Sequence, residues 1–305
     1  MSDASILLGE LKDKGIKIEE LKKSIGGNSK LYKFMLNGKS YVLKVYVGET
    51  VKKTQSRKRE IETLYFLKNF DLFQIPKLIL EFSPDDGLCL QYIPGKNPKQ
   101  NNRTNLEILY AFRNLKKIYK DSPGFMNAVD ACFSTSDVIE QIENRLQKTD
   151  FFNNRVLEKS LDKVKELTQV EFPKSSLTYS FSDVGAHNMI RRFRKYWFID
   201  FEFFGQDSAV KMISDYMLHP KNVFTDSTLK KCVKFANDAF GIDEKVLFDS
   251  IPFFAAKWAT IVSKRFISGT SSDLRLKAGI QINQYLELSS LSDSELIVRK
   301  LVNLR

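Results

Sequence analysis

The first part of the chain alternates apolar and polar residues in short runs, a pattern that predicts β-strands with one helix among them. Two such runs flank Asn37-Gly38, and Asn-Gly between apolar runs is the strongest local indication of a β-hairpin. Farther along, Glu60, Leu64 and Leu67 recur at the spacing of one helical face. The stretches are LYKFMLNGKSYVLKVY (31–46) for the hairpin, QSRKREIETLYFLKNF (55–70) for the helix, and QIPKLILEF (74–82) and GLCLQYIPG (87–95) for two further strands.

Beyond the last of these strands the apolar spacing changes to that of helices. We expect Leu106, Leu109, Phe112, Leu115 and Tyr119 to line one face of a long helix. Further helices are predicted near 136–148, 155–169, 227–239, 243–268, 273–289 and 293–303. One stretch, NMIRRFRKYWFID (188–200), instead predicts two short strands.

These elements predict an α+β fold with two lobes. A small β-rich N-terminal lobe spans 1–93, and a large, mainly helical C-terminal lobe with one embedded hairpin spans 94–305. A short connection is expected near 91–98. The chain of 305 residues is 43% hydrophobic and 28% charged, which is typical of a folded globular protein of this size.

Cysteine and histidine are too few and too scattered for a disulfide framework or a zinc site. Cys89, Cys132 and Cys232 lie far apart without a C-x-x-C pair, and the chain has only 2 histidines. The N-terminal stretch MSDASILLGELKDKG has a short apolar run that does not fit a signal peptide. The apolar stretch FFAAKWATIVSKRFI (253–267) contains two lysines and an arginine, so no membrane span is expected. We therefore expect a reducing, cytoplasmic setting.

The formal net charge of +11 makes a nucleic acid, an anionic lipid surface or an anionic small substrate worth considering. The densest basic runs, KKTQSRKR (52–59) and RRFRK (191–195), are typical of the solvated faces of a helix and a hairpin. No recognition helix or basic-aromatic strand motif accompanies them. A nucleic-acid partner is therefore not expected.

Three oxygen-bearing side chains in the C-terminal part suggest phosphoryl-transfer chemistry. Asp183 lies in the loop FSDVGAHN (181–188), where a carboxylate could take a proton from a substrate hydroxyl. Asn188 follows in the same loop, and Asp200 ends the apolar strand YWFID. Their oxygens suit Mg²⁺, which prefers hard oxygen ligands.

The N-terminal part offers a lysine that could contact a phosphate. Lys44 lies among apolar neighbours in YVLKVY, and a desolvated lysine needs an anionic partner. Glu60, on the apolar face of the following helix, is the natural candidate, with Glu62 as a competitor on a poorer face. Gly26 and Gly27 would let the main chain approach phosphates closely.

Each of these residues also has a structural explanation when it is taken alone. Asp183 and Asn188 could form turns or helix caps, and Lys44 could face solvent. Glu60 could pair with Arg57 or Lys58 on an exposed helix face, which contributes only a few tenths of a kcal/mol. The joint occurrence of all these elements in one order favours the phosphoryl-transfer interpretation.

In that order the chain resembles the aminoglycoside phosphotransferase and choline kinase-like family, which has a protein-kinase-like fold. FSDVGAHN resembles the family's catalytic loop, IDFE (199–202) its metal motif, GGNSKLY (26–32) its phosphate turn, REIETLYFL (59–67) its lobe-bridging helix and LQYIPG (90–95) its hinge. The catalytic loop is closest to a subgroup with Ser-Asp-x-Gly-x-His-Asn. The resemblance covers roughly 20–220 and leaves the last eighty residues without an expected role.

The resemblance implies an ATP- and Mg²⁺-dependent kinase that acts on a hydroxyl of a small molecule. It assigns Asp183 as the catalytic base, Asn188 and Asp200 as magnesium ligands, and Lys44, braced by Glu60, as the lysine on the α- and β-phosphates. It places the phosphates on the turn of Gly26, Gly27 and Asn28, and the adenine on the main chain of Gln91, Tyr92 and Ile93.

Two differences from the family pattern bear on activity. Phe181 stands where the family has a histidine, and Ser182 stands where it has a glycine. A nucleotide-binding pseudokinase or regulatory module without turnover is therefore the alternative function. A protein kinase is less favoured, because no Ala-Pro-Glu and no long activation segment follows Asp200. As acceptor we expect an anionic or neutral sugar, since a basic protein is a poor match for a polycationic aminoglycoside.

Overall fold

The structure is a computed structural model that describes residues 3–21, 29–82, 87–148, 154–268 and 272–304. The chain divides into two compact units, which we call the sheet unit and the helical unit. The sheet unit comprises Met1–Pro98 with His187–Phe204, and the helical unit comprises Lys99–Ala186 with Gly205–Arg305. The expected α+β class, with a β-rich N-terminal part and a mainly helical remainder, is confirmed.

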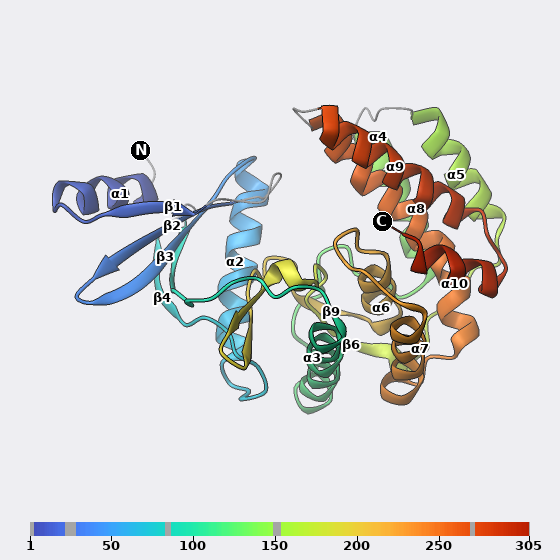
Figure 1. Cartoon of the computed structure of the whole chain (residues 1–305), viewed down its shortest axis with the longest axis horizontal. Helices are drawn as coiled ribbons and strands as arrows, with labels where there is room; N and C mark the ends of the chain where they lie inside the picture. Colours follow the sequence, from blue (N-terminus) through green and yellow to red (C-terminus); the bar gives the residue numbers. More distant parts are fainter. Residues whose placement is uncertain (1–2, 22–28, 83–86, 149–153, 269–271, 305) are drawn as a thin grey trace. The chain divides into compact units, whose positions relative to one another are not determined.

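Within the described residues, the sheet unit contains a five-stranded antiparallel sheet, the β7–β8 hairpin and the helices α1 and α2 (Figure 1). The strand order is β1-β2-β3-β5-β4. The elements are α1 (Asp3–Asp13), β1 (Ile18–Leu21), β2 (Ser29–Leu36), β3 (Lys39–Tyr46), α2 (Thr50–Leu67), β4 (Leu78–Phe82), β5 (Gly87–Gln91), β7 (Met189–Arg192) and β8 (Lys195–Phe198).

The predicted hairpin around Asn37-Gly38 is confirmed as β2 and β3. Asn37 and Gly38 have φ angles of 51° and 72°, the left-handed values that a two-residue hairpin turn requires and that Asn and Gly tolerate best. The sequence did not predict α1 and β1. Leu11 of α1 joins Phe34, Leu43 and Cys89 in a buried apolar cluster, so tertiary packing stabilises a helix whose own apolar run is short.

Helix α2 presents the predicted face to the interior. Glu60, Leu64 and Leu67 are only 1%, 3% and 1% exposed. The sheet beside α2 is tightly packed, because a Cβ on Gly87 of β5 would lie 2.6 Å from the carbonyl oxygen of Lys44. Glycine at position 87 therefore allows β5 to lie close to the main chain of β3 at Lys44.

The hairpin predicted within 188–200 is confirmed as β7 and β8, and it belongs to the sheet unit. Isolated β-bridges join it to that unit, one between Lys96 and Arg191 and one between Gln74 and Trp197. This attachment fixes the end of the hairpin that carries Asn188 and Asp200 relative to the strands of the same unit.

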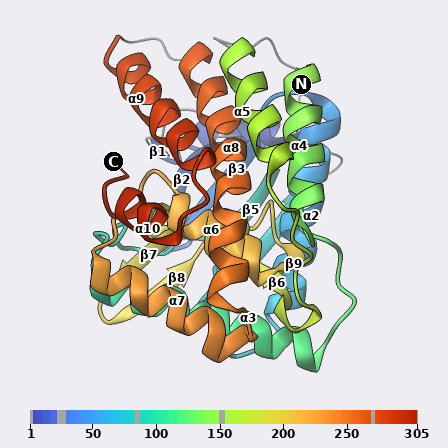
Figure 2. The ribbon, with the colours of Figure 1, turned by 90° about the vertical axis from the view of Figure 1, so that its right-hand side faces the viewer.

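The helical unit is organised around α8, which contacts α4, α5, α6, α7, α9 and α10. Figure 2 shows α4, α5, α8 and α9 running alongside one another. A two-stranded antiparallel ladder, β6 with β9, lies in the same unit. The elements are α3 (Asn102–Asp121), α4 (Thr135–Lys148), α5 (Asn154–Glu166), β6 (Leu177–Ser180), β9 (Gly205–Ser208), α6 (Ala209–Leu218), α7 (Asp226–Phe240), α8 (Glu244–Ser268), α9 (Ser272–Ser289) and α10 (Ser294–Val302).

Helix α3 departs from its predicted buried face at its N-terminal end. The buried face of α3 contains Leu109, Phe112 and Leu115 as predicted, but Leu106 is 57% exposed. A spacing of three residues turns a helical stripe by about 60° per step, so its first member leaves the buried face.

In α8, Glu244–Ser263 is long and apolar enough to cross a bilayer, yet 83% of its apolar window is buried within the protein.

Candidate active site

Lys44 is a buried lysine of β3, and the alternative of a solvent-facing strand position is wrong. The residue is only 4% exposed. It pairs across the sheet with Leu31 on one side and Leu88 on the other. A buried ammonium group is stable only when carboxylates or other acceptors replace its water.

Two carboxylates of the sheet unit supply that replacement. Lys44 Nζ donates to a Glu60 carboxylate oxygen and, at 2.5 Å, to Asp200 Oδ1. The hydroxyl of Tyr46 also donates to Glu60. Glu62 instead forms an exposed pair with Lys58 at 3.9 Å, and Arg57 donates to the carbonyl of Gly87. Glu60 is therefore the partner of Lys44, as the helical spacing predicted.

The charges of this cluster keep Lys44 protonated. Burial lowers the pKa of Lys44, but the carboxylates of Asp200 and Glu60 outweigh burial and raise it well above its ordinary value. Glu202, which is 4% exposed, adds to this effect. Burial, together with the Glu60 carboxylate, also raises the pKa of Tyr46 well above its usual range. Lys44 remains a cation at any physiological pH.

Asn188 and Asp200 lie at the same end of the β7–β8 hairpin. Met189 pairs with Phe198, and the amide of Ile199 donates to the carbonyl of Asn188 at 3.0 Å. The side chain of Asp200 is 37% exposed, so a ligand could reach it. Asp200 adopts a φ of 70°, a left-handed conformation that is strained for residues other than glycine. Residues in such strained conformations are concentrated at functional sites.

This donor set fits a magnesium ion. Carboxylate and amide oxygens are the ligands that Mg²⁺ takes in proteins, with water or phosphate at its other positions. Around the Lys44 ammonium lie the carboxylates of Glu60, Asp200 and Glu202. Their negative charges exceed the single positive charge, which favours a divalent cation beside Asp200.

The connection near 91–98 is fixed by hydrogen bonds from the side chain of Asn97 and from main-chain amides. Asn97 donates to the carbonyls of both His187 and Met189, at 2.9 and 2.8 Å, a role that the sequence did not predict. In the hinge, the amides of Gln91 and Tyr92 already donate to the carbonyls of Lys77 and Ser40. Among the described residues, the amide of Ile93 donates to no main-chain carbonyl.

The helical unit holds Asp183 in a tight turn after β6. The amide of Asp183 donates to the carbonyl of Phe181 at 2.8 Å, and the amide of Ser182 donates to Ser180 Oγ. Ser182 has a φ of 60°, which explains why glycine suits this position. Phe181 is 4% exposed, so its ring packs inside the unit.

Close packing at β9 fixes the start of this turn. Ser180, the last residue of β6, pairs with Gly205. A Cβ on Gly205 would lie 2.3 Å from the amide nitrogen of Ala128, so only glycine fits there. The side chain of Asp183 is nevertheless 38% exposed and could be reached by a substrate.

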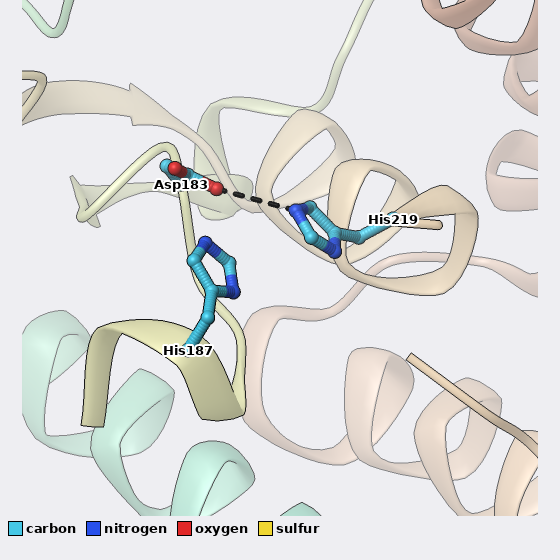
Figure 3. A group of neighbouring side chains, drawn as sticks. All are labelled: Asp183, His187 and His219. Carbon is cyan, nitrogen blue, oxygen red and sulfur yellow. Dashed lines mark ion pairs between the residues drawn. The ribbon is translucent and has the colours of Figure 1, made fainter. Parts of the chain in front are cut away.

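His219 lies beside Asp183 in the structure. Its Nε2 lies 3.4 Å from Asp183 Oδ1 (Figure 3). His219 is the C-cap of α6 and is only 3% exposed. Its place beside Asp183 had no signal in the sequence beyond the His-Pro pair after α6.

The phosphate turn lies outside this description. Gly26, Gly27 and Asn28 fall outside the described residues, so their expected role stays a prediction.

Comparison with known proteins finds likeness in structure alone, because no protein-family model and no curated protein matches the sequence. A choline kinase from Cryptosporidium parvum Iowa II matches with a TM-score of 0.66 at 14% identity, over 98% of each chain. The amicoumacin kinase hAmiN, in complex with AMP-PNP, Ca²⁺ and Ami, matches with a TM-score of 0.66 at 12% identity, over 97% of each chain. The aminoglycoside phosphotransferase APH(4)-Ia, with ADP and hygromycin B, gives 0.55 at 12% identity, over 94% of this chain and 100% of that one.

Proposed function

We propose that this chain, which has the protein-kinase-like fold of choline kinases and aminoglycoside phosphotransferases, is an ATP- and Mg²⁺-dependent kinase that phosphorylates a hydroxyl of a small molecule. The solved proteins that it resembles include complexes with ADP and AMP-PNP. Phosphoryl transfer asks a protein mainly to position its substrates and to stabilise charge, and the clusters around Lys44 and Asp183 suit these two tasks.

The observation that carries the proposal is the buried ammonium group of Lys44 between Glu60 and Asp200. Such a cluster is costly, because burying charges opposes folding unless their pairing is nearly complete. An ammonium group has three N–H donors, and the two carboxylates use two of them. The third is suited to an oxygen of the α- or β-phosphate of ATP.

In the proposed reaction Asp183 accepts the proton of the acceptor hydroxyl while that oxygen attacks the γ-phosphorus. The new oxygen–phosphorus bond forms as the bond between the γ-phosphorus and the β,γ-bridging oxygen breaks, and ADP leaves. Asn188 and Asp200 would hold Mg²⁺, which when bound neutralises charge on the phosphates. Lys44 orients the nucleotide, and Glu60 keeps Lys44 extended.

Hydrogen bonds within the hinge limit which main-chain amides could donate to adenine. Because the amides of Gln91 and Tyr92 are used within the sheet unit, we assign the donor to adenine to the amide of Ile93. The main-chain carbonyls of Gln91 and Ile93 would accept from the base. This arrangement selects adenine through main-chain geometry and not through side chains.

For the acceptor we propose an anionic or neutral sugar or sugar derivative. The net charge of +11 disfavours a polycationic aminoglycoside unless an acidic patch offsets it, and it favours approach of an anionic substrate. The identity of the acceptor is a more specific proposal than kinase activity itself, and the two are tested separately.

The test is an ADP-release screen with Mg·ATP over sugars, sugar phosphates, amino alcohols and aminoglycosides. Asp183→Asn should lower kcat by about 10²- to 10⁴-fold, because a general base contributes that much, while nucleotide affinity stays near that of the wild type. Asp226→Asn is the matched control, since Asp226 is an exposed residue paired with Lys230. Equal turnover of wild type and Asp183→Asn would remove Asp183 from the role of base.

A nucleotide-binding pseudokinase is the second candidate, and Phe181 is the observation that favours it. An apolar ring occupies the position where the family has a histidine, although its burial suits a packing role. Saturable binding of Mg·AMP-PNP together with silence across the whole acceptor panel would select this alternative over the kinase.

A further inference from the structure

We propose that His219 is a positioning residue that orients the carboxylate of Asp183, and that the C-terminal helices α8 and α9 hold His219 in place. The proposal rests on the phosphotransferase function proposed above. It gives a role to the last part of the chain, for which the sequence motifs offered none.

The hydrogen bonds of the imidazole determine which nitrogen faces Asp183. His219 Nδ1 accepts from the amide of Lys221 at 3.2 Å. An accepting Nδ1 carries no proton, so in the neutral ring the proton sits on Nε2. That nitrogen lies 3.4 Å from Asp183 Oδ1. An N–H donor therefore faces the carboxylate, at a distance that is commonly long in unliganded catalytic sites and shortens when substrate binds.

Trp258 of α8 holds the imidazole from one side. The two rings meet edge to face, with centroids 5.3 Å apart. The indole is itself fixed, because Trp258 Nε1 donates to Asp215 Oδ1 at 2.9 Å. Asp215 in turn lies 3.3 Å from the buried ammonium of Lys211. The edge-to-face contact thus connects His219 to a buried network of charged and polar groups on α6 and α8.

Tyr285 of α9 fixes the main chain just before His219. Its hydroxyl donates at 2.6 Å to the carbonyl of Leu218, the last residue of α6. Tyr285 is fully buried, and its ring stacks on Trp258 at 6.2 Å between centroids. One aromatic pair from two helices therefore fixes both the backbone and the ring of His219.

A fixed donor is useful to Asp183 because its side chain is partly exposed and lies in a turn. A partly exposed carboxylate can rotate between rotamers. Misplacement of a catalytic group by about 1 Å can lower the reaction rate about 10²-fold. When Oδ1 accepts from His219, the orientation of the carboxylate is set, and we assign Oδ2 to receive the proton of the acceptor hydroxyl. The proposed role is this choice of oxygen and rotamer.

The activity test compares His219→Gln with His219→Asn. Glutamine places an N–H donor near the position of Nε2, whereas the amide of asparagine lies near Nδ1. His219→Asn should lower kcat by about 10- to 100-fold with little change in the KM for ATP, and His219→Gln should recover most of that loss. Intrinsic hydrolysis of Mg·ATP, with water as acceptor, is the probe until an acceptor is known.

Trp258→Phe tests whether α8 acts through His219. The variant keeps a ring but removes the N–H that Asp215 accepts, so kcat should fall. In the His219→Asn background the same change should have little further effect, since residues acting through one group are non-additive. Equal kcat for His219→Gln and His219→Asn, or full additivity with Trp258→Phe, would overturn the proposal.

A spectroscopic test needs no turnover. The chain has only 2 histidines, so ¹⁵N-labelled imidazoles give few signals, and His187→Asn assigns them. We expect an unprotonated Nδ1 and a protonated Nε2 for His219, and Asp183→Asn should shift that Nε2 signal while Asp226→Asn should not. The opposite tautomer, or a signal that ignores Asp183→Asn, contradicts the proposal. If ATP is never turned over but these shifts appear, the kinase function fails and the His219–Asp183 contact stands.

Discussion

At the scale of single residues, the ammonium of Lys44 is a charge that is costly to bury in the sheet unit. It is buried between Glu60 and Asp200, and removing one partner of a buried ion pair leaves the other charge uncompensated. The nucleotide contact that we propose would explain such a group, since an apolar replacement of the whole cluster would often be as stable. The stability of the cluster can therefore be measured apart from its catalytic use.

Lys44→Met should lower the free energy of unfolding by about 3 kcal/mol, because Glu60 is left buried without its cation. Lys58→Met is the matched control. Lys58 pairs with Glu62 at 3.9 Å on the surface, and loss of an exposed pair costs about 0.5 kcal/mol or less. Urea unfolding followed by circular dichroism measures both.

Adding Glu60→Gln to Lys44→Met should recover part of the loss, since the uncompensated carboxylate is then removed. The pKa of Lys44 is raised in the folded state, so its charge stabilises the fold fully below the unfolded value, about 10.4. This contribution is lost as the pH rises through the higher folded value. The difference between wild type and Lys44→Met should thus shrink only above about pH 10.5. A difference that already vanishes at pH 8 contradicts the pairing.

Sequence reasoning found Lys44 and Glu60 because a local pattern placed both. Lys44 lies in an apolar strand, and Glu60 occupies the apolar face of the next helix. His219 and Asn97 were missed for the opposite reason. The position of His219 beside Asp183 depends on the end of α6 and on rings from α8 and α9, and no local pattern encodes such long-range contacts.

At the scale of elements, the β2–β3 and β7–β8 hairpins differ in the residue that opens the turn. Leu36 pairs with Lys39, and Arg192 pairs with Lys195, so each turn has two residues. The first turn residue has positive φ in both, 51° at Asn37 and 54° at Phe193. Asparagine tolerates this conformation, whereas a bulky aromatic residue is strained by it. Phe193 is also 85% exposed, and the contact of its ring with the Arg192 guanidinium, 5.7 Å from the centroid, contributes only about 0.5 kcal/mol at an exposed site.

Phe193→Gly should therefore raise the free energy of unfolding by about 0.5 to 1 kcal/mol, because the relieved strain exceeds the extra backbone entropy of glycine. Asn37→Phe, the converse change at the equivalent position of the first hairpin, should lower it by a similar amount. Thermal unfolding of the two variants beside the wild type measures both shifts. Destabilisation by Phe193→Gly would mean that the phenyl ring makes stabilising contacts.

The elements that the sequence predicted are those with a clear face or a turn signal. The β2–β3 hairpin has Asn-Gly, and α7 has an apolar stripe. In contrast, all ten residues of α6 are buried, including the polar Lys211, Ser214 and Asp215, so its polar side chains do not mark a solvent-exposed face. The ladder of β6 with β9 joins LTYS to GQDS. The alternation of LTYS is short and GQDS has none, so the pairing of two segments distant in the sequence stabilises both.

At the scale of the whole molecule, the residues that we propose for phosphoryl transfer are divided between the two compact units. Lys44, Asn188 and Asp200 belong to the sheet unit, and Asp183 belongs to the helical unit. The chain passes from one unit to the other between Asp183 and Asn188, within a single sequence motif. Each unit carries at least one buried cysteine, Cys89 in the first and Cys132 and Cys232 in the second, so thiol reactivity can report on each.

In the native protein at pH 8 the thiols should be inert to Ellman's reagent. Burial raises the pKa of Cys89 to about 11 and those of Cys132 and Cys232 to about 12, and only the thiolate is nucleophilic. In rising urea, Cys89 should become reactive first, because the smaller unit has less core relative to its surface. Two variants separate the reporters, Cys89→Ala for the helical unit and Cys132→Ala with Cys232→Ala for the sheet unit.

Mg·AMP-PNP should move the Cys89 transition to higher urea, since a ligand at a hundredfold excess over its Kd stabilises the bound state by about 2.7 kcal/mol. The Lys44→Met variant should lose this protection, because its nucleotide contact is gone. A single transition shared by all three thiols would mean that the chain unfolds as one cooperative body. Protection of Cys89 that survives Lys44→Met would place the nucleotide away from Lys44 and overturn the proposed site.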